Sequence, residues 1–352
     1  MAIALPPAKV LVTGVNGYLG MWIVRTLLEQ GYSVRATVRV ASKGMYVLEY
    51  FQKQGFRSDK LEIAIVDDIT KPGAFNEAVS GVDAIVHSAS PISVGVHDPE
   101  VFIKPAIQGT TGILQSAFEF GSNIKRVVIT SSGTTVLTRY EQPATFSEED
   151  WNADAVEDVE KNGSKSKPGS GYRASKVLAE RAAWKFYEKN KSKLNWDLTV
   201  VIPPVLLRPG TQEIPGGPSD LNASFKWLYE TTVNTLAQTQ EFLVNSSVWV
   251  DVRDAARGHM LALQKEDAGG ERIIVSTGPF VWQDLADAAS TLNPWPLPNH
   301  PAPKGNPELK RTYFTYFMTE KRERILGMVQ SEMKTMEESV KDALEDFAQR
   351  GW

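Results

Sequence analysis

Short runs of apolar residues recur through the first two hundred residues of the chain. The expected strands are residues 9–13, 33–39, 61–66, 84–87, 126–130 and 198–202. Stretches with helical spacing of apolar residues separate these runs; in residues 18–30, for example, Leu19, Trp22, Ile23 and Leu27 share one face. Continuous apolar runs are typical of strands that are buried on both faces. The alternation therefore predicts an α/β fold, a doubly wound parallel sheet of the Rossmann type.

The sequence changes character after residue 202. Residues 203–219 contain five prolines and three glycines, which predicts an irregular loop. A helix-like stretch follows at residues 223–238, a further strand at 248–252 and one or two amphipathic helices within 319–349. We therefore expect a first domain of residues 1–202 plus about 248–276, to which the later segment returns. A smaller, mostly helical lobe takes about 203–247 plus 277–352.

Composition excludes several classes of protein. The 352 residues include no cysteine, so disulfides, a thiolate nucleophile and a zinc finger are excluded. The formal net charge of −4 gives no basic surface for nucleic acid. The four histidines lack the spacing of metal ligands, so no metal site is expected. The sequence carries no signal-peptide pattern and no membrane-spanning apolar run, so we expect a cytoplasmic protein without a membrane or nucleic-acid partner.

A glycine pattern, TGVNGYLG at residues 13–20, lies where the first expected strand turns into the first helix. Gly14 and Gly17 would let the backbone approach a pyrophosphate at the helix N-terminus, and Gly20 would let helix and strand pack closely. A tight turn with incidental glycines is the alternative, but the position between strand and helix favours a dinucleotide. The expected cofactor contacts here are Gly14, Asn16, Gly17, Tyr18, Leu19 and Gly20.

Basic residues follow the second expected strand. An NAD site usually places an acidic residue there for the ribose hydroxyls, whereas this sequence has Arg39 and Lys43. Arginine can hold a phosphate by two parallel charged hydrogen bonds. The pattern predicts NADP(H) as cofactor, although a solvated basic residue at a strand end is the plain alternative, above all for Lys43.

Tyr172 and Lys176 are four residues apart in an expected helix, so both side chains would project from one face. An ammonium group nearby favours tyrosinate and would lower the pKa of the phenol, which makes Tyr172 a proton donor to a carbonyl oxygen. Ser132, at the end of an earlier strand, would hold the same oxygen as charge develops. The Tyr–Lys spacing is common by chance, and it gains meaning from the glycine turn and Ser132.

Several motifs together are similar to a known family. TGVNGYLG, DDI at 67–69, HSAS at 87–90, TSS at 130–132 and YRASK at 172–176 occur in the order typical of extended short-chain dehydrogenases/reductases. VRATVR at 34–39, KPAIQGT at 104–110, AAWKF at 182–186 and WVDVRDAARGH at 249–259 resemble the dihydroflavonol reductase-like group. That group includes yeast and fungal NADPH-dependent aldehyde and ketone reductases. The resemblance covers roughly residues 8–275.

The resemblance assigns roles by position. Ser132, Tyr172 and Lys176 match the catalytic triad of the family, and Lys176 would also bind the ribose of nicotinamide. The remaining expected cofactor contacts are Asp68 and Ile69 beside adenine, Ala89 and Ser90 on the nicotinamide-ribose side, Pro203 and Leu206 on nicotinamide, and also Thr130. Many members have Asn in a GTxN motif that supports a proton-relay water, whereas Gly112 stands here.

The resemblance implies NADPH-dependent reduction of an aldehyde or ketone by a monomer or homodimer. We expect Pro91, Ile92, Thr134 and Pro204 to contact the substrate, a small carbonyl compound of hydrophobic, uncharged character. An NAD-dependent nucleotide-sugar epimerase or dehydratase is the alternative within the fold, and Arg39 and Lys43 disfavour it. A catalytically silent NADPH-sensing regulator is the alternative of another class, although such a protein would typically lose the Tyr–Lys pair.

Overall fold

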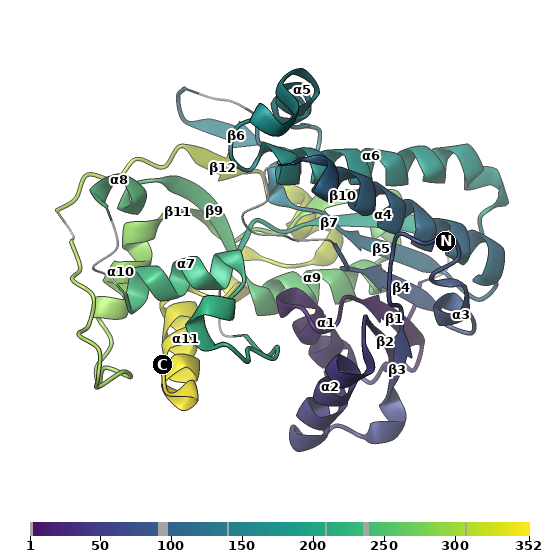
Figure 1. Cartoon of the computed structure of the whole chain (residues 1–352), viewed down its shortest axis with the longest axis horizontal. Helices are drawn as coiled ribbons and strands as arrows, with labels where there is room; N and C mark the ends of the chain where they lie inside the picture. The colour runs from purple at the N-terminus through teal and green to yellow at the C-terminus, as the bar shows by residue number, and fades with distance from the viewer. Residues whose placement is uncertain (1–2, 91–97, 139–140, 208–209, 235–238, 307) are drawn as a thin grey trace.

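A seven-stranded parallel sheet forms the centre of the molecule (Figure 1). The computed structural model describes residues 3–90, 98–138, 141–207, 210–234, 239–306 and 308–352. The strands are β1 (Lys9–Thr13), β2 (Ser33–Val38), β3 (Leu61–Ile65), β4 (Ala84–His87), β5 (Arg126–Thr130), β7 (Asp197–Ile202) and β10 (Arg272–Ile274). Their order is β10-β7-β5-β4-β1-β2-β3, so β2 and β3 are added on one side of β1 and the later strands on its other side, beginning with β4. The predicted doubly wound parallel sheet is confirmed.

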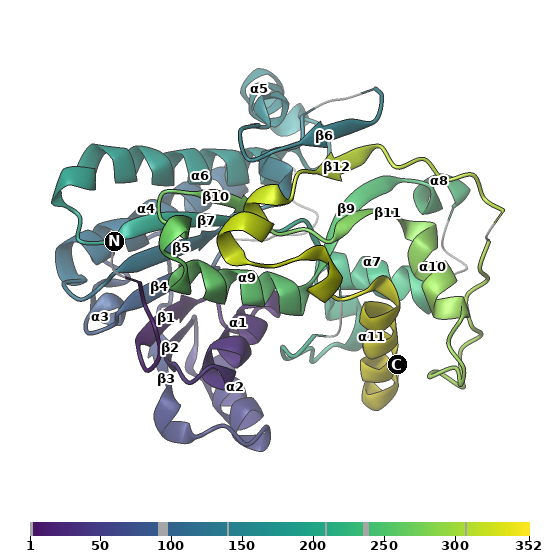
Figure 2. The same cartoon turned by 180° about the vertical axis from the view of Figure 1, so that it is seen from behind.

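Helices cover both faces of this sheet, and the alternation of strand residues explains why. Val10 and Val12 of β1 belong to one apolar cluster, whereas Leu11 between them belongs to another. The first face packs against α1 (Tyr18–Glu29), α2 (Ala41–Lys53) and α9 (Val252–Gln264). The second packs against α3 (Asn76–Val79), α4 (Glu100–Phe120) and α6 (Ser170–Asn190), as Figures 1 and 2 show.

The later part of the chain builds a smaller lobe beside the carboxyl ends of the strands (Figure 2). Its three-stranded sheet has the order β11-β9-β8, from β8 (Val205–Leu207), β9 (Ser246–Asp251) and β11 (Gly278–Val281). The helices are α7 (Ala223–Thr232), α8 (Gln240–Leu243), α10 (Trp282–Ser290) and α11 (Met336–Arg350). Phe225, Trp249, Trp282 and Phe347 fill the core of this lobe.

Two small elements lie at the upper edge of Figure 1: α5 (Ala153–Asn162) and the pair formed by β6 (Ala144–Phe146) and β12 (Thr315–Phe317). The residues that return to the main sheet differ from the expected ones. The expected strand at 248–252 is β9, which pairs with β8 and β11. Asp251 then caps α9, and β10 joins β7. The division into two domains stays a prediction.

Two helices expected in the later part have different lengths in the structure. α7 ends at Thr232, and residues 235–238 of the expected helix lie outside the described residues. The expected helices of 319–349 are a short π-helix at Arg322–Leu326 and α11. No helix in the described part of the chain has the length and hydropathy needed to cross a membrane.

Candidate active site

The turn between β1 and α1 brings the backbone close to the end of β4. Gly14 has a φ of 68°, and a Cβ at this position would lie 2.8 Å from Ala89 Cα. Gly17 is the N-cap of α1 and has no side chain that could cap the first-turn N–H groups. A Cβ on Gly20 would collide with the carbonyl oxygen of Gly14. Glycine is therefore required for this turn, which leaves the amides of a helix N-terminus open to an anion.

Hydrogen bonds hold the segment after β4 against the same turn. The hydroxyl of Thr13 accepts a bond from the Ala89 amide at 3.1 Å and pairs with His87 Nδ1 at 2.9 Å. Ser88 Oγ donates to the Thr13 carbonyl at 2.6 Å. Burial lowers the pKa of His87 to about 3, so this imidazole is neutral and serves the structure.

The side chain of Tyr18 turns away from the glycine loop toward the smaller lobe. It is buried, and its ring stacks on Phe225 of α7 with centroids 5.6 Å apart. Phe225 in turn packs on Phe347 of α11. The aromatic contacts therefore tie the start of α1 to the core of the smaller lobe.

Tyr172 and Lys176 project from α6 toward the segment that follows β5. Ser132 Oγ accepts hydrogen bonds from the Thr134 amide at 3.3 Å and the Thr134 hydroxyl at 3.1 Å. A side-chain hydrogen bond also joins Ser132 to Tyr172. The ammonium of Lys176 lies 5.9 Å from the centroid of the Tyr172 ring. The structure therefore brings the three predicted catalytic side chains together.

The protonation of this cluster differs from the expected one. Burial raises the pKa of Tyr172 above its usual value, and the hydrogen bond with Ser132 lowers it by less. Burial also lowers the pKa of Lys176 to about 8, against the opposing effect of Glu180. The expectation that Lys176 lowers the pKa of Tyr172 is wrong for this structure, because desolvation of the phenol dominates. Tyr172 is consequently protonated at neutral pH.

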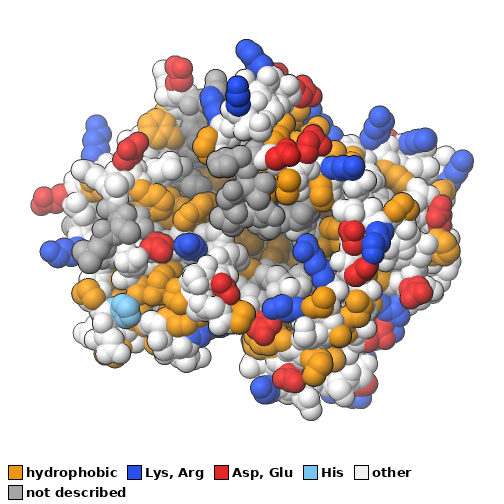
Figure 3. All heavy atoms as spheres, viewed as in Figure 1, with side chains coloured by type: hydrophobic (Ala, Val, Ile, Leu, Met, Phe, Trp, Pro, Cys, Tyr) orange, Lys and Arg blue, Asp and Glu red, His pale blue; other side chains and the backbone are white. Residues whose placement is uncertain are grey.

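A cavity of about 800 Å³ joins the glycine turn to this cluster, between the carboxyl ends of the strands and the smaller lobe. The predicted residues that line it are Gly14, Asn16, Gly17, Tyr18, Leu19, Gly20, Arg39, Ile69, Ala89, Ser90, Thr130, Ser132, Thr134, Tyr172, Lys176, Pro203, Pro204 and Leu206. Figure 3 shows the surface hollowed between the two lobes. The open amides at one end and the cation Arg39 fit a dinucleotide phosphate.

Other predicted residues are placed differently. Lys43 forms an ion pair with Glu213 at 2.8 Å and does not line the cavity. The carboxylate of Asp68 accepts hydrogen bonds from the amide and hydroxyl of Thr70, so it closes a turn beside Ile69. Pro91 and Ile92 lie outside the described residues.

Sequence reasoning missed part of the cavity wall. Pro99, which precedes α4, and Phe102 of α4 line it. Trp227 of α7 also lines it and remains 42% exposed. From the sequence, Trp227 could either form an aromatic wall of the pocket or pack in the core, and core packing is the more common role of a tryptophan in such a helix. Packing of α7 against α10, which buries Trp282 beside it, leaves Trp227 facing the cavity.

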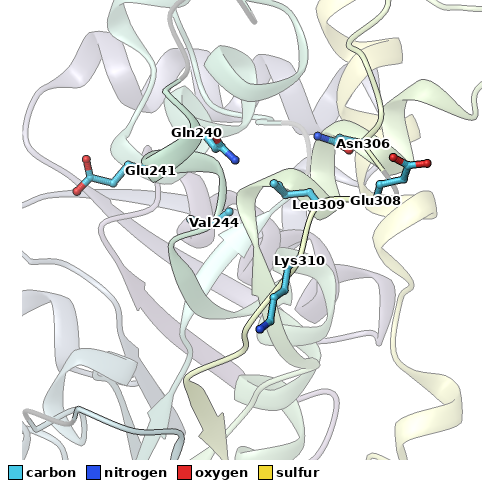
Figure 4. Close-up of a pocket in the computed structure, with 7 residues that line it drawn as sticks. All are labelled: Gln240, Glu241, Val244, Asn306, Glu308, Leu309 and Lys310. Atoms are coloured by element: carbon cyan, nitrogen blue, oxygen red, sulfur yellow. The ribbon is translucent and has the colours of Figure 1, made fainter.

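A second hollow, of about 640 Å³, lies on the far side of the smaller lobe and contains no predicted site residue. Gln240 of α8 and Val244, which follows α8, line it with Leu309 from the long loop before β12. In Figure 4, Gln240 and Leu309 point toward one another, whereas Glu241 and Glu308 point outward. This hollow has no catalytic cluster.

Comparison with known proteins identifies the family. The model of the NAD dependent epimerase/dehydratase family matches residues 10–278. The chain belongs to the NAD dependent epimerase/dehydratase family. The resemblance predicted from the motifs is thereby confirmed, since extended short-chain dehydrogenases/reductases make up this family.

Members of the NAD dependent epimerase/dehydratase family that are similar to this chain include named reductases. The ketoreductase azaE of Aspergillus niger is 33% identical, over 93% of this chain and 94% of that protein. A putative NADPH-dependent methylglyoxal reductase, GRP2 of Candida albicans, is 35% identical over 85% of this chain and 86% of that protein.

A solved structure agrees with these relatives. The yeast methylglyoxal/isovaleraldehyde reductase Gre2 complexed with NADPH superimposes with a TM-score of 0.83 at 28% identity, covering 97% of this chain and 99% of that chain. The predicted class of enzyme, an oxidoreductase, is supported by the curated relatives and by the solved structure.

Proposed function

We propose that this protein reduces an aldehyde or ketone to the alcohol with NADPH. The observation that carries the proposal is the single cavity that joins a phosphate-binding glycine turn to Ser132, Tyr172 and Lys176. Similarity to NADPH-dependent reductases supports it. When bound, NADPH supplies the hydride.

Different residues around the cavity would bind different parts of the cofactor. The amides at the start of α1 would hold the pyrophosphate, with Gly14 and Gly17 allowing its approach. Arg39 would hold the 2′-phosphate that distinguishes NADP from NAD. Ile69 would pack on adenine, and the segments around Ala89 and Pro203 on the nicotinamide end. The ion pair with Glu213 leaves Lys43 a secondary part in this binding.

The catalytic cluster would transfer one proton to the substrate. Ser132 Oγ accepts hydrogen bonds from Thr134, and its hydroxyl, hydrogen-bonded to Tyr172, would turn to the carbonyl oxygen when a substrate enters between them. Tyr172, protonated at neutral pH, donates its phenolic proton to the same oxygen as negative charge develops there. The ammonium of Lys176 stabilises the tyrosinate that this transfer leaves. The chain therefore supplies an acid, an orienting donor and a counter-charge.

The substrate end of the cavity is largely apolar. Pro204 and Thr134 line it, and Phe102, Leu137 and Trp227 add further apolar surface. Such a wall suits a carbonyl compound with a hydrophobic substituent. The expectation of a monomer or homodimer in the cytoplasm stays a prediction.

The experiment is a panel of aldehydes and ketones, with NADPH oxidation followed by absorbance and the alcohols separated on a chiral column. We expect turnover with NADPH well above that with NADH, and one dominant alcohol enantiomer from a prochiral ketone. NADPH binding without turnover across the panel would point to a regulator instead. Conversion of a nucleotide sugar with tightly held NAD would point to an epimerase or dehydratase.

A further inference from the structure

Glu180 is a carboxylate on α6 that the mechanism above does not use. It is only 2% exposed and lies four residues after Lys176, which in turn lies four residues after Tyr172. Residues at this spacing lie above one another on one helix face. Buried carboxylates are costly to desolvate unless they are paired, so its contacts indicate what Glu180 does.

The carboxylate joins three segments that are distant in the sequence. One oxygen, Oε2, accepts a hydrogen bond from the Ser131 hydroxyl. The other oxygen, Oε1, accepts from Arg272 Nε at 2.6 Å and from Trp184 Nε1 at 3.3 Å. Arg272 begins β10, and Ser131 follows β5. A single side chain thus connects the helix of Tyr172 to the segment of Ser132.

The bond with Ser131 bears directly on Ser132, the next residue. The Ser131 amide donates to the Val201 carbonyl at 2.8 Å, and the Thr135 hydroxyl donates to the Ser132 carbonyl at 2.8 Å. The bond to Val201 holds this segment against β7, and the bond to Glu180 holds it against α6. Without Glu180, no hydrogen bond from α6 would hold Ser131, and the distance between the Ser132 and Tyr172 hydroxyls would be less tightly fixed.

The charge of Glu180 also acts on Lys176. It raises the pKa of Lys176 against the lowering by burial, which leaves a value of about 8. The histidine that faces Lys176 from β4, His87, has a pKa of about 3, and His259 of α9 has a pKa of about 4, so both are neutral. Arg272 is the cation on β10 that partly offsets Glu180.

The other charged residues near this part of α6 have a weaker electrostatic effect on Lys176. The charged residues of α4, which packs along α6, are exposed: Glu100, Lys104 and Glu119. Arg272 is held in place by the Trp151 ring, whose centroid lies 3.7 Å from its guanidinium carbon. The Glu180–Arg272 pair is therefore the buried charged pair next to the catalytic lysine.

We propose that Glu180 is a positioning residue of this active site, which fixes Ser132 relative to Tyr172 through Ser131 and places a negative charge one turn from the Lys176 ammonium. The proposal rests on the proposed carbonyl reductase function. The buried ion pair with Arg272 then has a second role, because Arg272 offsets part of the electrostatic effect of Glu180 on Lys176.

The test compares Glu180→Gln with Arg272→Gln, which remove opposite charges from the same pair. In carbonyl reduction Lys176 must be protonated, so kcat/KM falls as pH rises through the apparent pKa of the Tyr172–Lys176 pair. Glu180→Gln should move this alkaline limb down by roughly one pH unit, because Lys176 loses its counter-charge. Arg272→Gln should move it up, because Glu180 then acts without its partner.

Displacement of the alkaline limb in opposite directions in the two variants would support a positioning role. A purely structural role would instead lower the stability of both variants and leave the limb at the same pH. Glu180→Gln should also lower kcat about tenfold at the pH optimum while KM for NADPH changes little. The double variant removes both members of the Glu180–Arg272 ion pair and leaves neither of them buried without the other, so its melting temperature should exceed that of either single variant. Its alkaline limb should lie between the two.

Displacement of the limb in the same direction in both variants, or in neither, would overturn the proposal. If Glu180→Gln does not fold, the upward displacement in Arg272→Gln still decides. NMR titration of the Lys176 side chain needs no turnover, so it tests Glu180 even if no carbonyl compound is reduced. In that case the proposed function fails while the effect of Glu180 on Lys176 is still measured.

Discussion

Arg39 is the residue on which the choice between NADPH and NADH should depend. It follows β2, lines the cavity and is exposed to solvent. A hydrogen bond to a charged group contributes about 1.5–3 kcal/mol, and solvent screening places an exposed contact near the lower limit. Arg39→Ala should therefore weaken kcat/KM for NADPH by roughly 10- to 30-fold. NADH lacks the 2′-phosphate, so its kcat/KM should change little.

Lys43 supplies a matched control, because its ion pair with Glu213 holds it away from the cavity. Lys43→Ala should reduce NADPH use by much less than Arg39→Ala. Glu213→Gln, combined with Arg39→Ala, should recover part of the preference, because a released lysine can approach the phosphate. The assay is kcat/KM for both cofactors at low and high salt, where the Arg39 effect should shrink as salt rises. Undiminished preference for NADPH in Arg39→Ala would refute the assignment.

Three further substitutions test the site and the fold. Tyr172→Phe should lower kcat by about 10²–10⁴-fold while NADPH binding, followed by fluorescence, is retained; near-normal turnover would contradict its role as acid. Gly20→Ala should weaken NADPH binding and lower the melting temperature, because its Cβ would collide with the Gly14 carbonyl; an unchanged protein would show that the turn relaxes freely. Asp197→Ala should cost about 3–5 kcal/mol in denaturant unfolding, since it leaves Arg126 buried and unpaired, and a loss below 1 kcal/mol would exclude this.

The parts of the fold that local pattern decides could be predicted from the sequence. The expected strand at 9–13 is β1 itself, because an apolar run followed by glycine has no alternative that buries it as well. The strand at 248–252 was also recognised, but not its partners. Pairing of β9 with β8 and β11 depends on side chains from three separate segments, which hydrophobic periodicity does not encode.

The site shows the same division. Gly14, Ser132 and Tyr172 could be placed because their roles depend on short spacings at the ends of strands or along one helix. The ion pair that withdraws Lys43 involves Glu213, which is 170 residues away. The raised pKa of Tyr172 likewise follows from burial, a property of the whole assembly. Local sequence carries neither kind of information.

The packing of α11 has a consequence for the order in which the protein matures during synthesis. Phe347 supplies a large side chain to the core of the smaller lobe, with its ring centroid 5.0 Å from that of Phe225, which stacks on Tyr18 beside the glycine turn. The ribosome delivers the glycine turn long before Phe347. The parallel sheet can form while translation continues, but its cavity stays open on one side until α11 emerges. A nascent chain stalled before α11 should therefore expose Phe225 to chaperones and hold its dinucleotide loosely.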